Sequence, residues 1–430
     1  MATPASSTPT QLSPSRGRLK SDATDDAAWV KTARWYGAMA WERSSCLETP
    51  PKLALHNVRT VRLGQGVADA CAADLAATGC KRVLVVTGAP IRSLCTGPEK
   101  ALGAAGCAVQ VLEASEGEPT LADLSASLAV AREFGADGVV GLGGGSAMDV
   151  AKLVAALIGG GQDFAEVVGT DLLRARHVPL ACIPTTAGTG SEVTPIAIVE
   201  DTEAQLKKGV VSPHLVPDFA YLDPELTRTM PRGVTAATGI DALTHCIESY
   251  ANKFAHPVVD QWALEGIRLV GRYLERACAD GGDIEARAGM LRASHLGGQC
   301  LGPVNTAAVH ALAYPLGGEF HVAHGVANSL LLPHVLRFNL EAAPDRYADI
   351  AEALGVQRSN DTGATALKGI ERIEQLSEAI GIERHLSAFG ISENTIPHMA
   401  AAAMTVQRLL VRNPREVTEA DAREIYQAAL

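Results

Sequence analysis

Short apolar runs alternate with amphipathic stretches between residues 81 and 183, and this alternation constrains the fold more than any other feature. The run 82–87 predicts a buried strand ending at Gly88, and residues 120–134 have helical spacing with Thr120 as a plausible N-cap. Further strands are expected at 106–112, 136–142 and 178–183, and a further helix at 147–158. This order implies right-handed crossovers and a parallel sheet covered on both faces.

The pattern changes after about residue 231, where strand-like runs give way to long helical patterns. These patterns lie at 236–251, 258–277, 284–298, 305–315, 326–338, 346–354, 364–380 and 420–430. We therefore expect an α/β domain over 50–231 and an all-helical domain over 232–430. The length of 430 residues also suits two hydrophobic cores better than one.

Residues 1–28 are rich in Ser, Thr, Pro and Ala and have no apolar periodicity, which predicts a disordered tail. Three basic residues and no acid in the first twenty positions are also typical of an organelle transit peptide. Prolines at positions 4, 9 and 14 would interrupt a targeting helix, so the plain tail is favoured. The expected location is the cytoplasm, with a mitochondrion or another organelle as the alternative.

Charge and cysteine usage exclude several classes of partner. The formal net charge of −11 argues against nucleic acids and anionic membranes, which bind basic surfaces. No apolar run is long enough to span a bilayer. The nine cysteines are scattered without a CxxC pair, which favours a reducing compartment over a disulfide framework.

A glycine-rich segment lies between a predicted strand and a predicted helix at 141–152, with the sequence GLGGGSAMDVAK. Consecutive glycines let the backbone approach a ligand, and the start of the helix presents free N–H groups to a pyrophosphate. The segment is not the GxGxxG fingerprint of ordinary dinucleotide-binding folds. It predicts phosphate binding at this turn, whereas Lys152 could be a ligand or a surface lysine.

The segment 184–192, PTTAGTGSE, follows the last predicted strand. Its hydroxyl groups and glycines suit hydrogen bonds to a ribose or a nicotinamide carboxamide. Alone, it would equally well be a turn leading into a helix cap. Beside the glycine-rich segment it predicts a coenzyme contact through Thr185, Thr186 and Thr189.

Asp241 and His245 stand four residues apart in a predicted helix, so both side chains lie on one face. His310 lies in another helical segment, and His324 precedes a glycine at the start of a third. One acid and three histidines form a four-ligand set for Fe²⁺ or Zn²⁺, with room for a substrate oxygen.

The segments GGGSAMD, TTAGTGSE, GIDALTHCIE and AHG resemble, in this order, those of the iron-containing, or group III, alcohol dehydrogenases. The resemblance covers roughly residues 50–430. It implies a dinucleotide-binding domain, a helical domain and a metal in the cleft between them, with Asp241, His245, His310 and His324 as ligands. It also implies NAD or NADP as coenzyme, Fe²⁺ ahead of Zn²⁺, an alcohol/carbonyl substrate and a homodimer or larger homo-oligomer. The coenzyme residues that it implies are Gly143, Gly144, Gly145, Ser146 and Asp149, with Thr185, Thr186 and Thr189 near the nicotinamide side and Lys208 as the lysine that follows the coenzyme loop.

Two positions depart from the family pattern. Many members carry a histidine four residues after the third ligand, where this chain has Tyr314. A tyrosine ordinarily titrates near pH 10, so it is a poor proton acceptor near neutral pH. Tyr314 is the catalytic candidate at this position, but either it only shapes the pocket or the proton leaves through the coenzyme ribose and water. His321 is either an alternative relay or a surface residue. The second departure is Gly88, where the family commonly has an acid that binds the adenine ribose, so we expect tolerance of NADP.

Other functions remain open at this stage. A hydroxyacid–oxoacid transhydrogenase of the same family would need no added coenzyme, and a maleylacetate-reductase-like activity is a weaker alternative. Lyases related to dehydroquinate synthase lack the GIDALTHCIE segment. A non-catalytic binding protein would have no physical need for four converging metal ligands.

Overall fold

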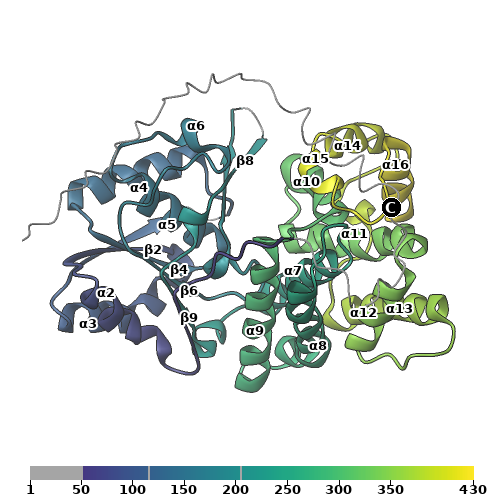
Figure 1. Ribbon diagram of the computed structural model, residues 1–430, viewed down its shortest axis with the longest axis horizontal. Coiled ribbons are helices and arrows are strands. Elements are labelled where there is room, and N and C mark those ends of the chain that lie inside the picture. The colour runs from purple at the N-terminus through teal and green to yellow at the C-terminus, as the bar shows by residue number, and fades with distance from the viewer. Residues whose placement is uncertain (1–51, 115–116, 204–205) are drawn as a thin grey trace, which may run out of the picture. The chain divides into compact units, whose positions relative to one another are not determined.

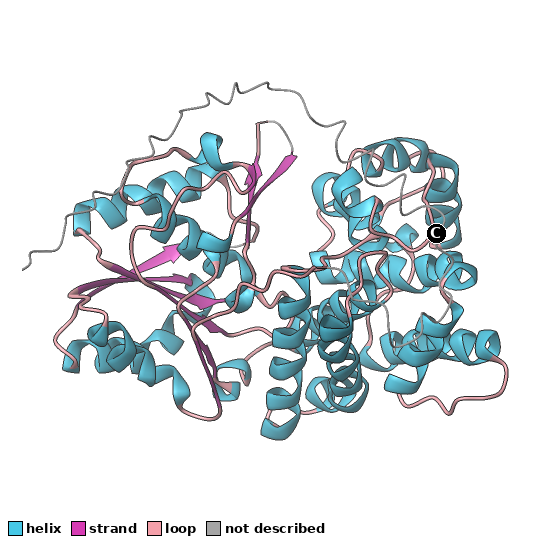
Figure 2. Cartoon of the chain, viewed as in Figure 1, coloured by secondary structure: helices cyan, strands magenta, loops and turns pink. Residues whose placement is uncertain are grey.

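The computed structural model describes residues 52–114, 117–203 and 206–430, all of which belong to one compact unit. The predictions for residues 1–28 lie outside this described part. Six parallel strands form the main sheet in the order β1-β9-β6-β4-β2-β3, which confirms the expected fold class (Figures 1 and 2). They are β1 (Thr60–Leu63), β2 (Arg82–Gly88), β3 (Ala108–Ala114), β4 (Gly138–Gly143), β6 (Leu180–Pro184) and β9 (Phe219–Leu222).

Helices cover both faces of this sheet. α4 (Leu121–Phe134) and α5 (Gly145–Leu157) pack with Leu84 and Val86 of β2, whereas α2 (Cys71–Ala77) and α3 (Thr96–Ala104) pack with Val83 and Val85. Successive side chains of a strand point to opposite faces, so a strand buried on both sides is a continuous apolar run. Thr120 caps α4 as expected and forms a capping box with Asp123.

A second, three-stranded sheet was not predicted. It consists of β5 (Gly169–Thr170), β7 (Ile196–Asp201) and β8 (Leu206–Val211), in the order β5-β8-β7. β7 and β8 pair antiparallel, so the α/β part is not purely parallel. β8 has the sequence LKKGVV, in which two lysines and a glycine conceal the apolar pattern of a strand.

Helices follow from residue 232 onward. They are α7 (Arg232–Tyr250), α8 (Pro257–Ala279), α9 (Ile284–Leu301), α10 (Ala308–Phe320), α11 (His324–Asn339), α12 (Pro344–Ala353), α13 (Thr362–Ile380), α14 (Ile396–Ala403), α15 (Gln407–Leu410) and α16 (Glu419–Ala428). Because α7 starts at Arg232, we propose the domain boundary at residues 231 and 232. α10 starts later than expected because Asn305 has a positive φ of 78°. The short α14 and α15 were not predicted.

Short helical segments connect the main elements. They are η1 (Val67–Ala70), η2 (Ala89–Cys95), α6 (Phe164–Val167), η3 (Ser191–Val193), η4 (Pro213–Leu215), η5 (Pro224–Thr227), η6 (Leu340–Ala342) and η7 (Leu386–Phe389). The helical core also takes in Ala187 and Val193, which follow β6 and thereby fix the TTAGTGSE segment against the helices. Within the described ranges, no helix combines the length and the hydropathy that crossing a bilayer requires.

Candidate metal centre and coenzyme pocket

Helix α7 supplies two candidate metal ligands from one face. Asp241 and His245 lie four residues apart, so their side chains leave the helix in the same direction. Asp241 Oδ1 and His245 Nε2 are 3.6 Å apart, and both side chains are buried. The local geometry expected from the spacing is therefore present.

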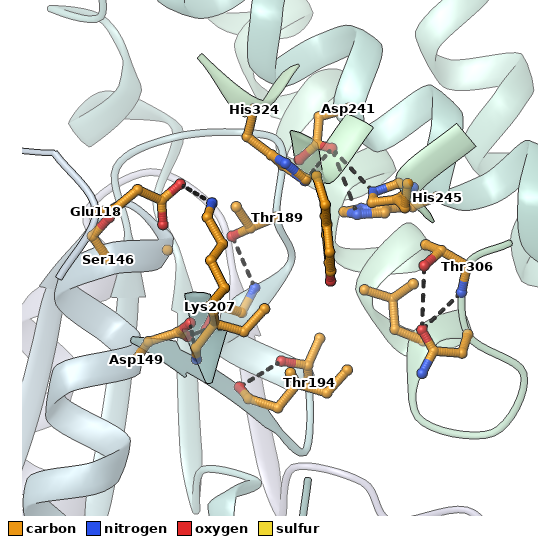
Figure 3. A pocket seen from close by; sticks show the side chains of 18 of the residues that line it. Glu118, Ser146, Asp149, Thr189, Thr194, Lys207, Asp241, His245, Thr306 and His324 are labelled. Carbon is orange, nitrogen blue, oxygen red and sulfur yellow. Dashed lines mark hydrogen bonds and ion pairs between the residues drawn. The ribbon is translucent and has the colours of Figure 1, made fainter. Parts of the chain in front are cut away.

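Helices α10 and α11 bring two more side chains to the same point. His310 Nε2 lies 3.6 Å from Asp241 Oδ1, and His324 Nε2, at the first residue of α11, lies 3.5 Å from it. Figure 3 shows Asp241, His245 and His324 directed toward one another. Ligand atoms of Asp241, His245 and His310 all lie within 4.8 Å of one another, whereas the partly exposed His324 joins them through its contact with Asp241.

The spacing of these atoms fits a metal ion. Tetrahedral coordination with bonds of about 2.0–2.2 Å separates neighbouring ligand atoms by about 3.4 Å. The distances of 3.5–3.6 Å from Asp241 Oδ1 to three histidine nitrogens are close to this value. The amide group of Asn328 also reaches three of the acceptors, with Nδ2 at 2.8 Å from Asp241 Oδ1, 3.2 Å from His310 Nε2 and 3.3 Å from His324 Nε2. The lone pairs of these atoms therefore converge.

The electrostatics of the cluster favour a cation. Burial alone would raise the pKa of Asp241, but the surrounding histidines outweigh burial and hold this pKa far below its ordinary value. Burial likewise opposes charge on His310, yet Glu248 and Asp241 together raise the pKa of His310 to about 9. Two buried carboxylates therefore give this pocket a strong preference for positive charge.

Glu248 is a functional candidate that the sequence analysis missed. It lies in α7, and its Oε2 accepts a hydrogen bond from His310 Nδ1 at 2.5 Å, while its Oε1 accepts one from the backbone N–H of Val309 at 2.6 Å. Because a carboxylate only accepts, His310 Nδ1 carries a proton, so Nε2 is the nitrogen that faces the cluster and would bind a metal on losing its own proton. The sequence did contain a pattern that could have identified Glu248. It lies seven residues after Asp241 and therefore on the same helical face.

The glycine-rich segment forms a tight turn from β4 into α5. Gly144 is the N-cap and α5 begins at Gly145, so the first N–H groups of the helix are free for an anion. A Cβ on Gly145 would lie 2.9 Å from Thr189 Cγ2, and one on Gly144 would lie 3.5 Å from Thr186. The two predicted coenzyme segments therefore touch, and glycine permits the contact.

These segments and the metal cluster line one cavity of about 280 Å³. Of the predicted coenzyme residues, Gly145, Ser146, Asp149 and Thr189 line it, together with all four candidate ligands. Figure 3 shows Ser146 and Asp149 on the side away from the ligand cluster, with Thr189 between them and the cluster. Thr185 is buried, and its N–H donates to Gly143 O, so it holds the turn in place.

Lys152 is fully buried, so a surface position for this lysine is ruled out. Its Nζ donates to Ser191 Oγ at 2.7 Å, to Thr194 Oγ1 at 2.9 Å and to the carbonyl of Ile196. Ser191 Oγ in turn donates to Asp149 Oδ1 at 2.6 Å. Burial raises the pKa of Asp149 and lowers that of Lys152, and each charge partly offsets the effect on the other. These hydrogen bonds join α5 to Ser191 and Thr194, which line the cavity.

The structure places Lys207, rather than Lys208, in the cavity. Lys207 lines it and pairs with Glu118 at 2.7 Å. Lys208 pairs instead with Asp201 at 2.6 Å. Neighbouring residues of a strand face opposite ways, so an assignment that is one residue out puts the ammonium group on the wrong side.

Tyr314 lines the cavity four residues after His310. Its hydroxyl accepts a hydrogen bond from Arg408 Nη2 at 2.8 Å. His321 is exposed, has a positive φ of 53° and lines an adjoining cavity rather than this one. The structure therefore brings Tyr314, but not His321, to the cavity of the metal cluster.

Comparisons with known proteins agree with this geometry. Residues 59–224 match the family model "Iron-containing alcohol dehydrogenase", and residues 235–430 match "Fe-containing alcohol dehydrogenase family, C-terminal". Long-chain-alcohol dehydrogenase 1 of Geobacillus thermodenitrificans is 40% identical over 377 residues, which are 85% of this chain and 94% of that protein.

Solved structures show the same fold. A 1,3-propanediol oxidoreductase superposes with a TM-score of 0.86 at 35% identity, covering 88% of this chain and all of that one. The sulfoacetaldehyde reductase of Bifidobacterium kashiwanohense, solved with NAD⁺, gives a TM-score of 0.79 at 30% identity over 89% of this chain and 99% of its own. This chain belongs to the iron-containing alcohol dehydrogenase family.

Proposed function

We propose that this chain catalyses the reversible oxidation of small primary alcohols to aldehydes with NAD or NADP, on a divalent metal held by Asp241, His245, His310 and His324. One observation carries the proposal. The four candidate ligands line the same cavity as the N-terminus of α5 and the adjoining threonine segment. A hydride donor and a polarised substrate oxygen can therefore meet there.

A divalent metal at this cluster would polarise the substrate oxygen as a Lewis acid. Ser146 and the free N–H groups of α5 would bind the pyrophosphate of the coenzyme, and Thr189 would contact its nicotinamide side. Lys207 takes the role that the sequence analysis gave to Lys208. The ligand types suit Fe²⁺ and Zn²⁺ alike, and the preference for Fe²⁺ rests on the family.

Tyr314 shapes the pocket in this proposal and does not accept the proton. Its hydroxyl oxygen already accepts from the guanidinium of Arg408. A bound coenzyme would then supply its ribose hydroxyl groups, together with water, as the route for the proton. The names of the relatives, which include long-chain alcohols and 1,3-propanediol, support an alcohol substrate here.

Metal analysis of anaerobically purified protein, together with turnover of short alcohols on added NAD or NADP, tests the proposal. About one Fe or Zn per chain with turnover is the expected result. Metal without turnover on added coenzyme would favour the transhydrogenase, in which hydride passes between a hydroxy acid and an oxo acid. Protein without metal that still turns over alcohols would contradict the ligand assignment.

Gly88 should make the chain tolerant of NADP, and Gly88→Asp should shift preference toward NAD by about tenfold. Gly88 ends β2 with φ −96° and ψ 146°, and an added Cβ would meet Ile91 and Pro90 only at 3.8 Å, so a side chain fits without strain. An aspartate would repel the 2′-phosphate of NADP. The measurement is the ratio of kcat/KM for the two coenzymes, with Gly88→Asn as the uncharged control. A wild-type enzyme that uses NADP more than about a hundredfold less efficiently than NAD would contradict the predicted tolerance.

We also propose a cytoplasmic homo-oligomer. The eight described cysteines are all free and buried, which supports a reducing compartment. Among the described residues, β1 lies at an edge of the main sheet with Val61 and Leu63 exposed, and this edge could pack against a second copy. Light scattering on the purified protein measures the mass of the assembly.

A further inference from the structure

A second cavity of about 860 Å³ adjoins the one that holds the metal cluster. It lies between the β7–β8 hairpin and helices α10, α14 and α15. Five residues line both cavities, and we call them the junction: Ile196, Ile198, Lys207, Tyr314 and Arg408. A substrate whose hydroxyl group reaches the metal cluster and whose chain extends outward would pass this junction.

Arg408 gives the junction a positive charge that no described carboxylate neutralises. Its guanidinium is exposed, donates to Tyr314 OH at 2.8 Å and lies 5.9 Å from the centre of the Tyr314 ring. An arginine carries five N–H donors, so most of them are free for a ligand. Lys207, by contrast, is already paired with Glu118.

Arg412, four residues further along in the turn after α15, adds a second positive charge to the neighbourhood. Burial, and then the charge of Arg408, lower the pKa of Arg412. Its Nη1 donates to the carbonyl of Val304. The hydrogen-bond partners of both arginines are therefore uncharged, so the electrostatic potential around them stays positive.

The spacing of residues on α10 sets the distance from the metal cluster to the junction. Tyr314 follows His310 by four residues on α10, which is about 6 Å along the helix axis.

Beyond the junction, the outer cavity is lined by Glu200 and Glu319, and Glu319 is paired with His398 at 3.1 Å. Glu200 would repel an anion that extended past Arg408, so the favourable place for a negative charge is the junction itself.

We propose that the junction is an anion-binding subsite, in which Arg408, positioned by Tyr314, holds the carboxylate of a short ω-hydroxy acid while its hydroxyl group faces the metal cluster. The inference rests on the proposed dehydrogenase function and narrows its substrate class. A fork of guanidinium N–H groups matches a carboxylate in shape and charge. The hydride step is unchanged, because the carboxylate only anchors the far end of the substrate.

The test compares 3-hydroxypropanoate, 4-hydroxybutanoate and 5-hydroxypentanoate with the 1-alkanols of equal carbon number. For at least one length, the wild-type enzyme should show a kcat/KM for the acid on the order of 10-fold or more above that for the alkanol. Arg408→Leu should lower this ratio by on the order of 10- to 100-fold, through KM rather than kcat, with metal content unchanged. Arg408→Lys keeps the positive charge but lacks the forked N–H groups of a guanidinium. Its ratio should therefore fall between that of the wild type and that of Arg408→Leu.

Arg423→Leu is the matched control, since Arg423 is a half-exposed arginine on α16 that pairs with Glu419. This variant should leave the ratio unchanged. Alkanol turnover without any preference for the acids, or a preference that survives Arg408→Leu, would overturn the subsite while leaving the dehydrogenase function intact. Failure to turn over any alcohol would instead remove the proposed function on which the subsite rests.

Discussion

Asp241→Ala should abolish metal binding and lower kcat/KM for alcohol oxidation by at least about 10³-fold, which is about 4 kcal/mol of transition-state stabilisation. Asp241 Oδ1 is the atom from which three histidine nitrogens lie 3.5–3.6 Å away, so its loss removes the centre of the ligand set. It also removes a negative charge from a buried cluster of histidines. Metal per chain, measured by mass spectrometry after anaerobic purification, should fall together with turnover.

His310→Ala should behave in the same way, because it removes one of four ligands. His295→Ala is the control, since His295 is also a buried histidine beside a buried glutamate, with Nδ1 3.1 Å from Glu192 Oε1, but lies outside the cluster. This control should keep its metal. Full turnover in metal-free Asp241→Ala protein of native fold would refute the proposed role of the cluster.

The metal cluster was predictable because part of its geometry is local. An aspartate and a histidine four residues apart on a helix must share a face, whatever the rest of the chain does. His310 and His324 could be named from residue type and from the family resemblance, but their convergence on Asp241 Oδ1 depends on how α10 and α11 pack against α7. The contact between Asn328 and Asp241 also depends on packing, since Asn328 lies on α11 and Asp241 on α7.

Other features depended on tertiary packing that no sequence pattern reports. The choice between Lys207 and Lys208 needs the pairing register of β8, and a shift of one residue reverses which lysine faces the cavity. Lys152 looked like an ordinary helical lysine, yet α5 is buried on all sides, and polar groups 39 to 44 residues away hydrogen-bond its ammonium group. Arg408 lies 94 residues from Tyr314, in a helix of four residues without a periodic pattern.

Glu248→Gln should weaken metal binding by about 10- to 100-fold, the range typical for the loss of a carboxylate that orients a ligating histidine. Two donors face Glu248, the Nδ1–H of His310 at 2.5 Å and the N–H of Val309 at 2.6 Å. A carboxylate offers an oxygen to each, whereas an amide has one oxygen and one NH₂ group. The variant must therefore leave one buried donor unpaired or turn the imidazole of His310, and either change misdirects Nε2.

Glu192→Gln separates this effect from the general consequence of removing a buried charge. Glu192 is as buried as Glu248, but its side chain meets a single partner, His295 Nδ1, to which a glutamine can still present its oxygen. Anaerobic competition between each protein and a chelator for Zn²⁺ or Fe²⁺ should show weaker affinity for Glu248→Gln alone. Equal weakening in both variants would mean that burial of charge, and not the direction of the His310 lone pair, sets the affinity. Unchanged affinity in Glu248→Gln would mean that the packing of α10 against α7 already fixes the imidazole, and that the carboxylate is dispensable for holding the metal.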